Sequence, residues 1–536
     1  MRETGDGAPS GGSSLDSQRQ PAASTSSQAP AAVNPSPVAR PPSPGFSDIT
    51  TQLGVDVRHR ENDFQDYSRE PLIPHRLSAE GPALAVGDVN GDGLDDMYVG
   101  GGKWQPGTLL VQQKGGTFRT VAEPDIAADS LAEDVDAAFF DADGDGDLDL
   151  YVVSAGNEFT GQDAALLDRL YLNDGHGSFR KAPGALPAFF DNGSCVVPGD
   201  FDGDGDIDLF IGSRDVAGKY GVTPRSHLLR NDGKGQFTDV TDEIAPGLAE
   251  AGMVTSAAWV AHPGTKALDL VVVGEWMPVR VFRQENGRFV DRTAEAGLAK
   301  TEGWWNSVTS ADLNGDGRPD LVLGNLGLNS YLKASPNEPT RLYVGDFAHN
   351  GGAQQILTSY RQGISYPVAG RDELVRLVPS LRSKFPTYAS FGGSRVEDMF
   401  TASELSQATV REARVFASSV AFEQADGTYK LQPLPAEAQF APVFASVVRD
   451  FDGDGHVDLL LAGNLYGVQP FLGRYDASSG TLLRGLGDGR FTSADRSDLG
   501  IEGEVRGMKL VRLAGGGSAI AVARNNATLL ILRPEP

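Results

Sequence analysis

The stretch Asp141-Ala-Asp143-Gly-Asp145-Gly-Asp147-Leu-Asp149 decides the fold, and it runs directly into Leu-Tyr-Val-Val. Carboxylates stand at positions 1, 3, 5 and 9 of this nine-residue loop, and glycines between them allow a sharp turn. Four carboxylates with this spacing can converge on one hard cation, to which position 7 can add a backbone carbonyl. Oxygen-only ligation suits calcium rather than zinc or copper. The stretch therefore predicts a calcium site followed by a β-strand.

The same loop occurs five times in the chain, beginning at Asp88, Asp141, Asp200, Asp312 and Asp450. Asparagine replaces aspartate at position 3 in the first and fourth copies. We therefore expect about five calcium ions. The predicted ligands are Asp88, Asn90, Asp92, Asp96, Asp141, Asp143, Asp145, Asp149, Asp200, Asp202, Asp204, Asp208, Asp312, Asn314, Asp316, Asp320, Asp450, Asp452, Asp454 and Asp458.

An EF-hand is the competing interpretation of such a loop. It requires a bidentate glutamate at position 12 and flanking helices. Position 12 is apolar in every copy, being Val99, Val152, Ile211, Leu323 and Leu461. A β-branched apolar run follows each loop instead, which predicts a strand.

The repeat around each loop predicts four antiparallel strands. One apolar strand leads into the loop and a second leaves it, and a third ends in a turn such as Asn173-Asp174-Gly175. Asn/Asp-Gly turns of this kind favour hairpins. A fourth strand then begins with phenylalanine, at Phe118, Phe179, Phe237, Phe289 and Phe491. Four-stranded units repeated every 50–60 residues or so are typical of β-propeller blades.

Two further units have lost ligands. The stretch Ala261–Thr265 lacks them, although Asp269 and the strand after it remain, and we expect no calcium there. The stretch Asp346–Gln354 keeps only a partial set.

The ends of the chain predict how the ring closes. Residues 1–44 are rich in Ser, Ala, Pro and Gln, which predicts a disordered linker. The stretch Phe46–Thr50 resembles the fourth strand of other repeats, whereas Val505–Leu532 ends one strand short. Pairing the two would hide exposed strand edges.

The blade count rests on the leading strands. Counting those near residues 83, 135, 194, 254, 306, 341, 444 and 506 favours eight blades. Seven stays open because the unit at 306–340 has unclear outer strands. Between about 371 and 414 the apolar spacing becomes helical, which predicts a small helical insertion in one blade, all within a propeller spanning 45–536.

Composition excludes several functions. A net charge of −26 argues against nucleic acid as a partner. No apolar run is long enough to span a membrane, and the single cysteine, Cys195, excludes an internal disulfide framework. Open calcium loops favour an extracytoplasmic location (secreted, periplasmic or cell surface). No signal peptide begins this chain, so we expect it to be part of a longer multidomain protein.

The loops resemble the FG-GAP or VCBS repeats of the integrin-α propeller, whose Asp-rich loops hold calcium at one rim. Stretches such as His59-Arg-Glu-Asn-Asp-Phe64 and Gly324-Asn-Leu-Gly-Leu-Asn329 are similar to bacterial VCBS-repeat proteins associated with an ASPIC/UnbV domain. The resemblance implies a calcium-binding, integrin-like repeat protein.

Two functions remain open. The first is a binding or adhesion module for a protein or glycan, with calcium structural and no catalytic residue. The second is a glycan lyase or hydrolase in the central channel or under the helical insertion. Its candidate residues, for which core packing is the competing explanation, are Trp304, Trp305, Asn306, Asn329, Arg361, Tyr366, Arg371, Tyr388 and Tyr475.

Overall fold

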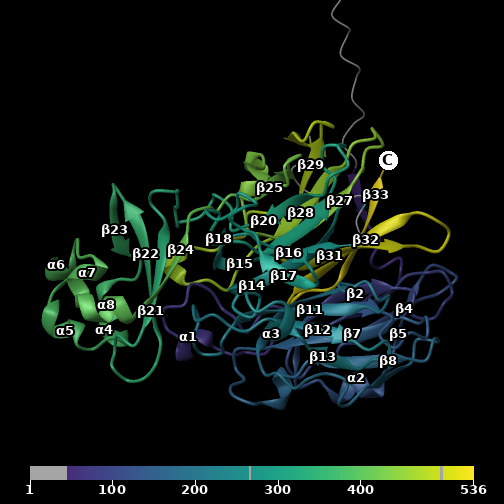
Figure 1. Cartoon of the computed structure of the whole chain (residues 1–536), viewed down its shortest axis with the longest axis horizontal. Coiled ribbons are helices and arrows are strands. Elements are labelled where there is room, and N and C mark those ends of the chain that lie inside the picture. Colours follow the sequence, from purple (N-terminus) through teal and green to yellow (C-terminus); the bar gives the residue numbers. More distant parts are fainter. Residues whose placement is uncertain (1–44, 263, 265–266, 495–498, 536) are drawn as a thin grey trace, which may run out of the picture. The chain divides into compact units, whose positions relative to one another are not determined.

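The computed structural model describes residues 45–262, 264, 267–494 and 499–535, so the linker expected at 1–44 lies outside the described residues. Within the described part, most regular structure is antiparallel β, arranged in eight sheets (Figure 1). None of the described helices is long and apolar enough to cross a membrane.

Seven of the sheets are the blades of a β-propeller. The first strand of each blade lines a central channel, and the first strands of successive blades lie next to one another around the ring. The strands of each blade are given from the inside outward. Blade one is β2 (Leu84–Gly87), β3 (Asp96–Val99), β4 (Thr108–Gln112) and β5 (Phe118–Val121), and blade two is β6 (Glu133–Phe140), β7 (Asp149–Ala155), β8 (Arg169–Asn173) and β9 (Phe179–Lys181). Blade three is β10 (Asn192–Gly199), β11 (Asp208–Asp215), β12 (His227–Asn231) and β13 (Phe237–Asp239), and blade four is β14 (Met253–Ala261), β15 (Leu268–Met277), β16 (Arg280–Glu285) and β17 (Arg288–Asp291). The last three are β19 (Ser307–Ala311), β20 (Asp320–Gly324), β25 (Ser419–Glu423) and β26 (Tyr429–Pro433); β27 (Val443–Arg449), β28 (Asp458–Gly463), β29 (Thr481–Gly485) and β30 (Phe491–Ser493); and β31 (Glu504–Arg512), β32 (Ser518–Asn525), β33 (Leu530–Glu535) and β1 (Gly45–Asp48). A two-residue strand, β18 (Gly303–Trp304), also pairs with β15.

The second strand of a blade is buried on both faces because each blade packs between two neighbours. In β7, Leu150 and Val152 pack in a cluster with residues of blade one, whereas Tyr151 and Val153 pack in a cluster with residues of blade three. Alternate side chains of a strand point to opposite faces, so one continuous apolar run serves both clusters.

Strands from both ends of the chain close the ring, as the sequence predicts. β1 pairs antiparallel with β33, with Phe46 opposite Pro534, and it completes the seventh blade. Phe46 also packs edge-on against Phe451 of blade six, at 5.7 Å between ring centroids. The closing strand therefore covers the sheet edge that β33 would otherwise expose.

The preference for eight blades is wrong, because the eighth sheet is not part of the ring. That sheet contains β21 (Thr340–Gly345), β22 (Gln354–Arg361), β23 (Ile364–Pro367) and β24 (Thr409–Ala413). It is inserted between β20 and β25, the second and third strands of blade five (Figure 1). The sequence does not show the outer strands of that blade next to its inner strands because β25 and β26 come after the insertion.

The helices of the insertion lie between β23 and β24. They are α4 (Arg371–Leu377), α5 (Leu381–Lys384), α6 (Tyr388–Phe391), α7 (Val396–Met399) and α8 (Ala402–Gln407). Their apolar side chains pack on Tyr343 and Ile356 of the inserted sheet. The predicted helical region is thus confirmed up to Gln407, whereas residues 409–413 form a strand that pairs with β21.

Residues 56–82, which we call the crossing segment, connect β1 to β2 and include α1 (Asp66–Arg69). They lie against the ends of several blades. Tyr67 donates to the Gly467 carbonyl of blade six, Asp66 accepts from Asn157 after β7, and the backbone of Arg58 forms a bridge with Thr528 in blade seven. These contacts are at the ends of the blades opposite the Asp loops.

Candidate metal centres

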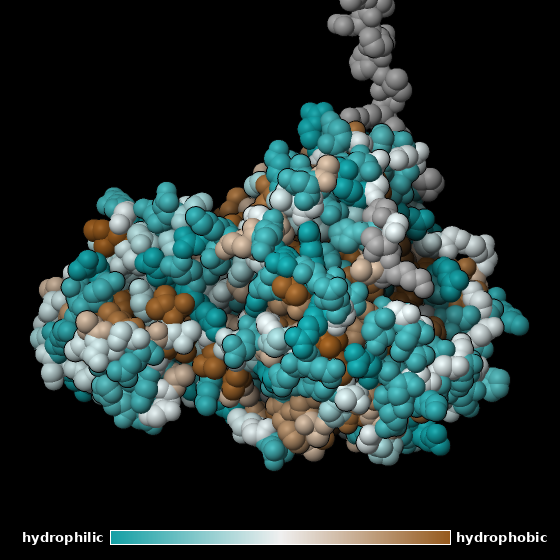
Figure 2. Space-filling model, viewed as in Figure 1, coloured by the Kyte–Doolittle hydropathy of each residue, from teal (hydrophilic) through white to brown (hydrophobic). Residues whose placement is uncertain are grey.

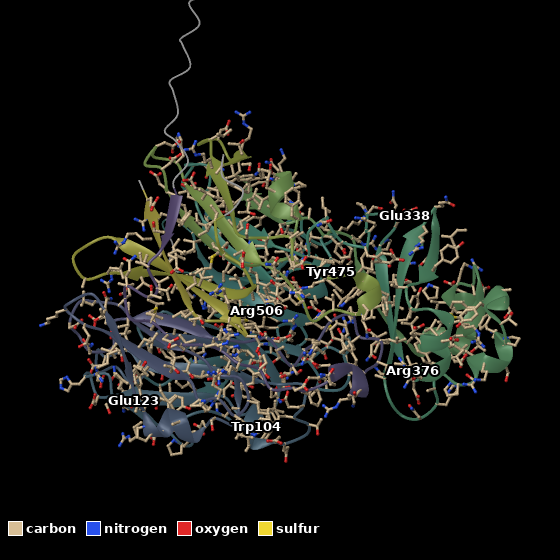
Figure 3. The ribbon with its side chains drawn as sticks, turned by 180° about the vertical axis from the view of Figure 1, so that it is seen from behind. Trp104, Glu123, Glu338, Arg376, Tyr475 and Arg506 are labelled. Carbon is tan, nitrogen blue, oxygen red and sulfur yellow. The ribbon has the colours of Figure 1, made fainter. Side chains whose placement is uncertain are left out.

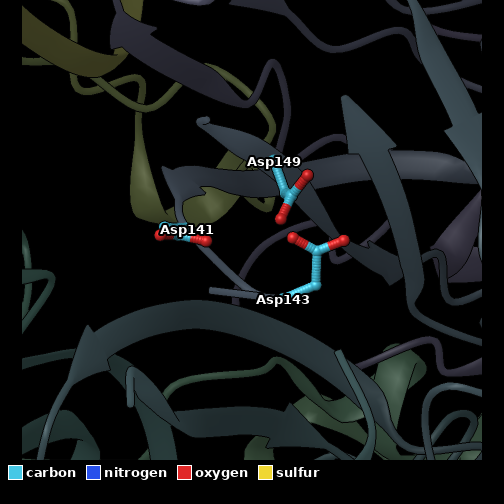
Figure 4. Close-up of side chains that lie close together, drawn as sticks. All are labelled: Asp141, Asp143 and Asp149. Atoms are coloured by element: carbon cyan, nitrogen blue, oxygen red, sulfur yellow. The ribbon is translucent and has the colours of Figure 1, made fainter. Parts of the chain in front are cut away.

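Each Asp loop joins the first strand of a blade to the second, so the five loops lie at the same end of their blades. In three loops the carboxylates at positions 1, 3 and 9 have oxygens within 4.8 Å of one another. Figure 4 shows one such triad, with Asp143 facing Asp149 and Asp141 to one side. The three triads are Asp141, Asp143 and Asp149; Asp200, Asp202 and Asp208; and Asp450, Asp452 and Asp458. Converging carboxylates of this kind fit a hard divalent cation.

The aspartate at position 9 is the most buried member of each triad, and it joins the loop to the third strand. Asp149 Oδ2 accepts a hydrogen bond from the backbone N–H of Ala142, and Oδ1 accepts one from the N–H of Asn173, both at 2.8 Å. The same two bonds recur at the other four loops: Asp96 with Val89 and Gln112, Asp208 with Phe201 and Asn231, Asp320 with Leu313 and Glu423, and Asp458 with Phe451 and Gly485.

The turn of the loop orients the other carboxylates. Asp141 accepts hydrogen bonds from the N–H groups of Gly144 (2.8 Å) and Gly146 (3.0 Å). Asp145, at position 5, accepts from the N–H of Asp147 at 3.0 Å and is not part of the triad. Positions 1, 3 and 9 of the predicted ligand set therefore come together in these three loops, and a ligand role for position 5 stays a prediction.

The two loops with asparagine follow a similar backbone path. Asp88 accepts hydrogen bonds from the N–H groups of Asp92 (3.1 Å) and Gly93 (2.7 Å). Asp312 accepts from the N–H groups of Gly315 and Gly317, both at 2.8 Å. An amide oxygen at position 3 is also an acceptable calcium ligand. Calcium at these two loops stays a prediction.

Among the described residues, arginines pair with the position 3 carboxylates of two triads, and no side-chain cation pairs with the triad of the Asp141 loop. Arg230 pairs with Asp202 at 2.9 Å, and Arg484 pairs with Asp452 at 3.0 Å. Asp143 is the equivalent position 3 carboxylate, and its Oδ1 is buried without a hydrogen bond. The carboxylates of this triad therefore retain the most uncompensated negative charge.

Burial makes this charge costly at position 9. Burial, together with repulsion from neighbouring carboxylates, raises the pKa of Asp149 and of Asp208 to about 7, although hydrogen bonds from backbone N–H groups oppose this rise. The pKa values of Asp96 and Asp320 rise to about 6 for the same reasons. A bound cation would stabilise the ionised carboxylates and release protons.

The two degenerate loops differ from each other. In blade four, Asp269 keeps position 9, and its Oδ2 lies 3.0 Å from His262 Nε2 and 3.2 Å from Arg283 Nε. The other loop joins β21 to β22 in the inserted sheet, and Gln354 replaces the aspartate of position 9 there. Gln354 Oε1 accepts a hydrogen bond from the N–H of Ala348 at 2.8 Å, so the neutral amide maintains the turn.

The central channel encloses a cavity of about 450 Å³. Polar groups of its wall include Asp136, Asn306, Arg506 and Lys509, and Figure 3 shows Arg506 among the strands at the centre. The crossing segment contributes Glu80, whose carboxylate pairs with Arg214 at 2.8 Å.

A buried polar network lies beside this end of the channel, and the sequence patterns did not indicate it. Glu275 pairs with Arg214 at 2.6 Å and with His75 Nε2 at 2.9 Å, and it accepts a hydrogen bond from the Tyr220 hydroxyl. These partners hold the pKa of Glu275 well below its usual range despite burial. Only spatial proximity joins the residues, because they come from the crossing segment and from blades three and four.

The candidate catalytic residues are dispersed rather than gathered in one site. Trp304 and Trp305 are buried core residues, as is Tyr475. Asn306 lines the channel, and Asn329 donates to the Phe440 carbonyl. Arg361, Tyr366, Arg371 and Tyr388 belong to the inserted sheet and its helices, where Arg371 lies 5.6 Å above the Tyr388 ring. Core packing explains Trp304, Trp305 and Tyr475.

Comparison with known proteins identifies the repeats. A model of the FG-GAP-like repeat matches residues 88–152, 141–211 and 264–323, and a model of the FG-GAP repeat matches residues 304–344. Cartilage acidic protein 1 of Mus musculus is 26% identical over 415 residues, which cover 72% of this chain. The chain spans 58% of the length of that relative.

Among solved structures, the V. cholerae biofilm matrix protein Bap1 aligns over 89% of this chain and 90% of its own, with 11% identity and a TM-score of 0.36. The narrower likeness to ASPIC/UnbV-associated proteins stays an expectation. The repeat-family matches cover four of the five Asp loops completely, all but the loop that begins at Asp450. On these residues, the chain contains FG-GAP repeats, the repeat of integrin-α-like propellers.

Proposed function

We propose that the chain is an extracellular calcium-stabilised binding module, in which calcium fills the Asp loops and a protein or glycan partner binds elsewhere on the ring. The observation that carries this proposal is the recurrence of one carboxylate triad in three equivalent loops. A net charge of −26 adds to it, because bound calcium would offset much of that charge.

The position of the loops supports a structural role for calcium. Each loop joins two strands of one blade, and its position 9 carboxylate is already bonded to the third strand. A cation held there links three strands at once. Affinities on the order of 10⁻⁴–10⁻³ M are typical of extracellular modules, which fits the proposed location. The match to a relative named for cartilage also supports it.

An exposed apolar patch is the surface proposed for the partner. Leu328, Tyr331 and Phe440 are 52%, 45% and 48% exposed. The N–H of Leu328 donates to the Gln439 carbonyl, which places Leu328 next to Phe440. Arg361 lies 5.1 Å above the Tyr331 ring. Aromatic and arginine side chains together favour protein or glycan recognition. Figure 2 shows that hydrophilic side chains cover most of the visible face around separate hydrophobic groups.

Binding to protein and glycan arrays with and without calcium tests the proposal. We expect binding that is lost in the double variant Tyr331→Ser, Phe440→Ser and retained in Leu131→Ser, a control at an isolated exposed leucine. Chelation should weaken binding only as far as it destabilises the ring. Binding that survives the double variant would contradict the patch, and a melting temperature unchanged by chelation would contradict structural calcium.

A further inference from the structure

The crossing segment carries a second group of carboxylates, at the end of the blades opposite the Asp loops. Glu61 and Asn62 come from this segment, and Glu133 and Glu158 come from blade two. The side chains of Glu61 and Glu158 are each 3% exposed, and Glu133 is 0% exposed. Asn62 Nδ2 donates a hydrogen bond to Glu158 Oε1 at 2.8 Å, and Glu133 Oε2 lies against Gly156, two residues before Glu158, which places the groups together.

Each of these four residues has one buried oxygen without a hydrogen-bond partner. The atoms are Glu61 Oε2, Asn62 Oδ1, Glu133 Oε2 and Glu158 Oε2. Buried polar atoms in folded proteins nearly always have a partner, so four unpaired oxygens in one group require an explanation. None of these oxygens can donate a hydrogen bond while the carboxylates are ionised. In the ionised state they cannot satisfy one another, so the missing partner of the ionised group is a cation or a hydrogen-bond donor.

Three donors nearby are already used on other oxygens, and His59 Nε2, 3.8 Å from Glu61 Oε1, is too far away to form a hydrogen bond. Asn525 Nδ2 donates to Glu61 Oε1 at 2.6 Å, and Asn62 Nδ2 donates to Glu158 Oε1 at 2.8 Å. The backbone N–H of Glu80 donates to Glu133 Oε1 at 3.3 Å. These bonds orient the three carboxylates and leave one free oxygen on each.

Two glycines make room for the free oxygens. A Cβ atom at Gly102 would lie 2.8 Å from Glu61 Oε2, and one at Gly156 would lie 3.2 Å from Glu133 Oε2. The backbone therefore approaches these oxygens closely where no side chain covers them.

Side-chain cations compensate the group only in part. Lys103 Nζ lies 3.6 Å from Glu158 Oε1, and the charges of Arg76 and Arg506 act on Glu61 from farther away. Burial raises the pKa of Glu61 to about 8, and burial with the repulsion of Glu61 and Glu158 raises the pKa of Glu133. The group is therefore costly to ionise without a further positive charge.

We propose that Glu61, Asn62, Glu133 and Glu158 bind one calcium ion, which ties the crossing segment to blade two. Calcium takes six to eight oxygen ligands and accepts carboxylates, amide carbonyls and water. Among the described residues, these carboxylates are not as closely spaced as the Asp triads. Binding would therefore draw them together or retain water between them and the ion. The site is separate from the Asp loops, so its failure and theirs can be told apart.

Counting bound calcium in Glu133→Gln tests the proposal. The substitution keeps the shape of the side chain and removes its charge, and we expect one ion fewer than in the wild type. Asp143→Asn, in an Asp loop, should remove a different ion, so the double variant should lose two. An unchanged count in Glu133→Gln would overturn the proposal.

Terbium luminescence gives a second test that needs no change in the group itself. Lys103 Nζ lies 5.1 Å from the centroid of Trp104, so this indole stands near Glu158 and can sensitise a bound Tb³⁺. Trp104 is 69% exposed, and Trp104→Phe should leave the fold intact. We expect part of the tryptophan-sensitised signal to disappear in Trp104→Phe at an unchanged ion count. A signal of undiminished intensity would contradict the site.

Discussion

The Asp141 loop of blade two and the His262 loop of blade four occupy equivalent places, and they surround the same carboxylate with side chains of opposite charge. Both keep an aspartate at position 9, Asp149 in one and Asp269 in the other. Around Asp149 the neighbours are the carboxylates of Asp141 and Asp143. Around Asp269 they are His262 and Arg283, whose nitrogens lie 3.0 and 3.2 Å away.

This difference shows what the loop requires. A negative charge at the start of the second strand must be balanced, either by side chains of the protein or by an ion. In blade four, His262 also contacts a carboxylate of the next blade, because its Nδ1 lies 3.4 Å from Glu423 Oε1 of β25. Blade four keeps its four-stranded sheet although the ligand set is missing, and the absence of calcium there stays a prediction. Among the described residues, the loop of blade two has only carboxylates around Asp149, and the proposed calcium ion would balance their charge.

Removing calcium from the whole protein should have the largest effect. A ligand present at 100 times its dissociation constant stabilises the folded state by about 2.7 kcal/mol per site. Chelation should therefore lower the melting temperature markedly in a calorimetric scan. Equal melting temperatures in chelator and in millimolar calcium would contradict the proposal that calcium in the Asp loops stabilises the fold.

Removing the position 9 carboxylate should cost more in blade two than in blade four. Asp149→Ala leaves two buried N–H groups unpaired, at about 1–3 kcal/mol each, and also disrupts the metal site. Asp269→Ala breaks ion pairs between a buried carboxylate and two partly exposed side chains, His262 and Arg283, and we expect a loss of about 1 kcal/mol. Urea denaturation should show that only the first loss grows when calcium is added. If Asp149→Ala lost the same unfolding free energy with and without calcium, the assignment of Asp149 as a calcium ligand would be contradicted.

Asp143→Asn should change stability in opposite directions with and without calcium. With calcium, the loss of one ligand should cost up to about 2.7 kcal/mol. In chelator it should be neutral or stabilising, because it removes repulsion among three carboxylates. Asp147→Asn is the matched control, since it makes the same charge change at position 7, outside the predicted ligand set. The two variants should differ only in calcium.

The two loops should also respond to pH in opposite directions, which is the smallest effect. Because the pKa of Asp149 is raised to about 7 without metal, protons compete with calcium below that pH, and calcium affinity should fall as pH drops from 7. The pKa of His262 is raised mainly by its bond to Asp269. Its ion pair therefore contributes stability below the unfolded value of about 6.5 and loses it as pH rises through the higher folded value.

Calcium titrations at several pH values measure the first trend. The melting temperature of His262→Gln in chelator, compared with that of the wild type, measures the second. His262→Gln should be destabilising at pH 5.5 and nearly silent at pH 8. If calcium affinity does not change between pH 5.5 and 7.5, the raised pKa of Asp149 has no role in binding.

The local parts of the fold could be predicted from the sequence, whereas the connection across the insertion could not. Phe46 identified the closing strand because the fourth strand of a blade repeats a recognisable pattern. The sequence predicts a blade at the inserted sheet because Asp346–Gln354 keeps a blade-like turn. Nothing in the apolar periodicity shows that β20 pairs with β25, which begins at Ser419.

The same distinction applies to the candidate sites. The ligands of an Asp loop lie within nine residues of one another, so their spacing alone predicts the triads. The group of Glu61, Glu133 and Glu158 comes from three distant positions, and each residue alone resembles any other glutamate. Only the folded crossing segment brings them together.

Equilibrium dialysis of the metal-free chain against calcium tests the central claim most directly, because it measures the number of ions bound per chain. The account predicts five ions in the Asp loops, and a sixth that disappears in Glu133→Gln. Three loops carry a full carboxylate triad. A content of fewer than three ions per chain at saturating calcium would contradict the account.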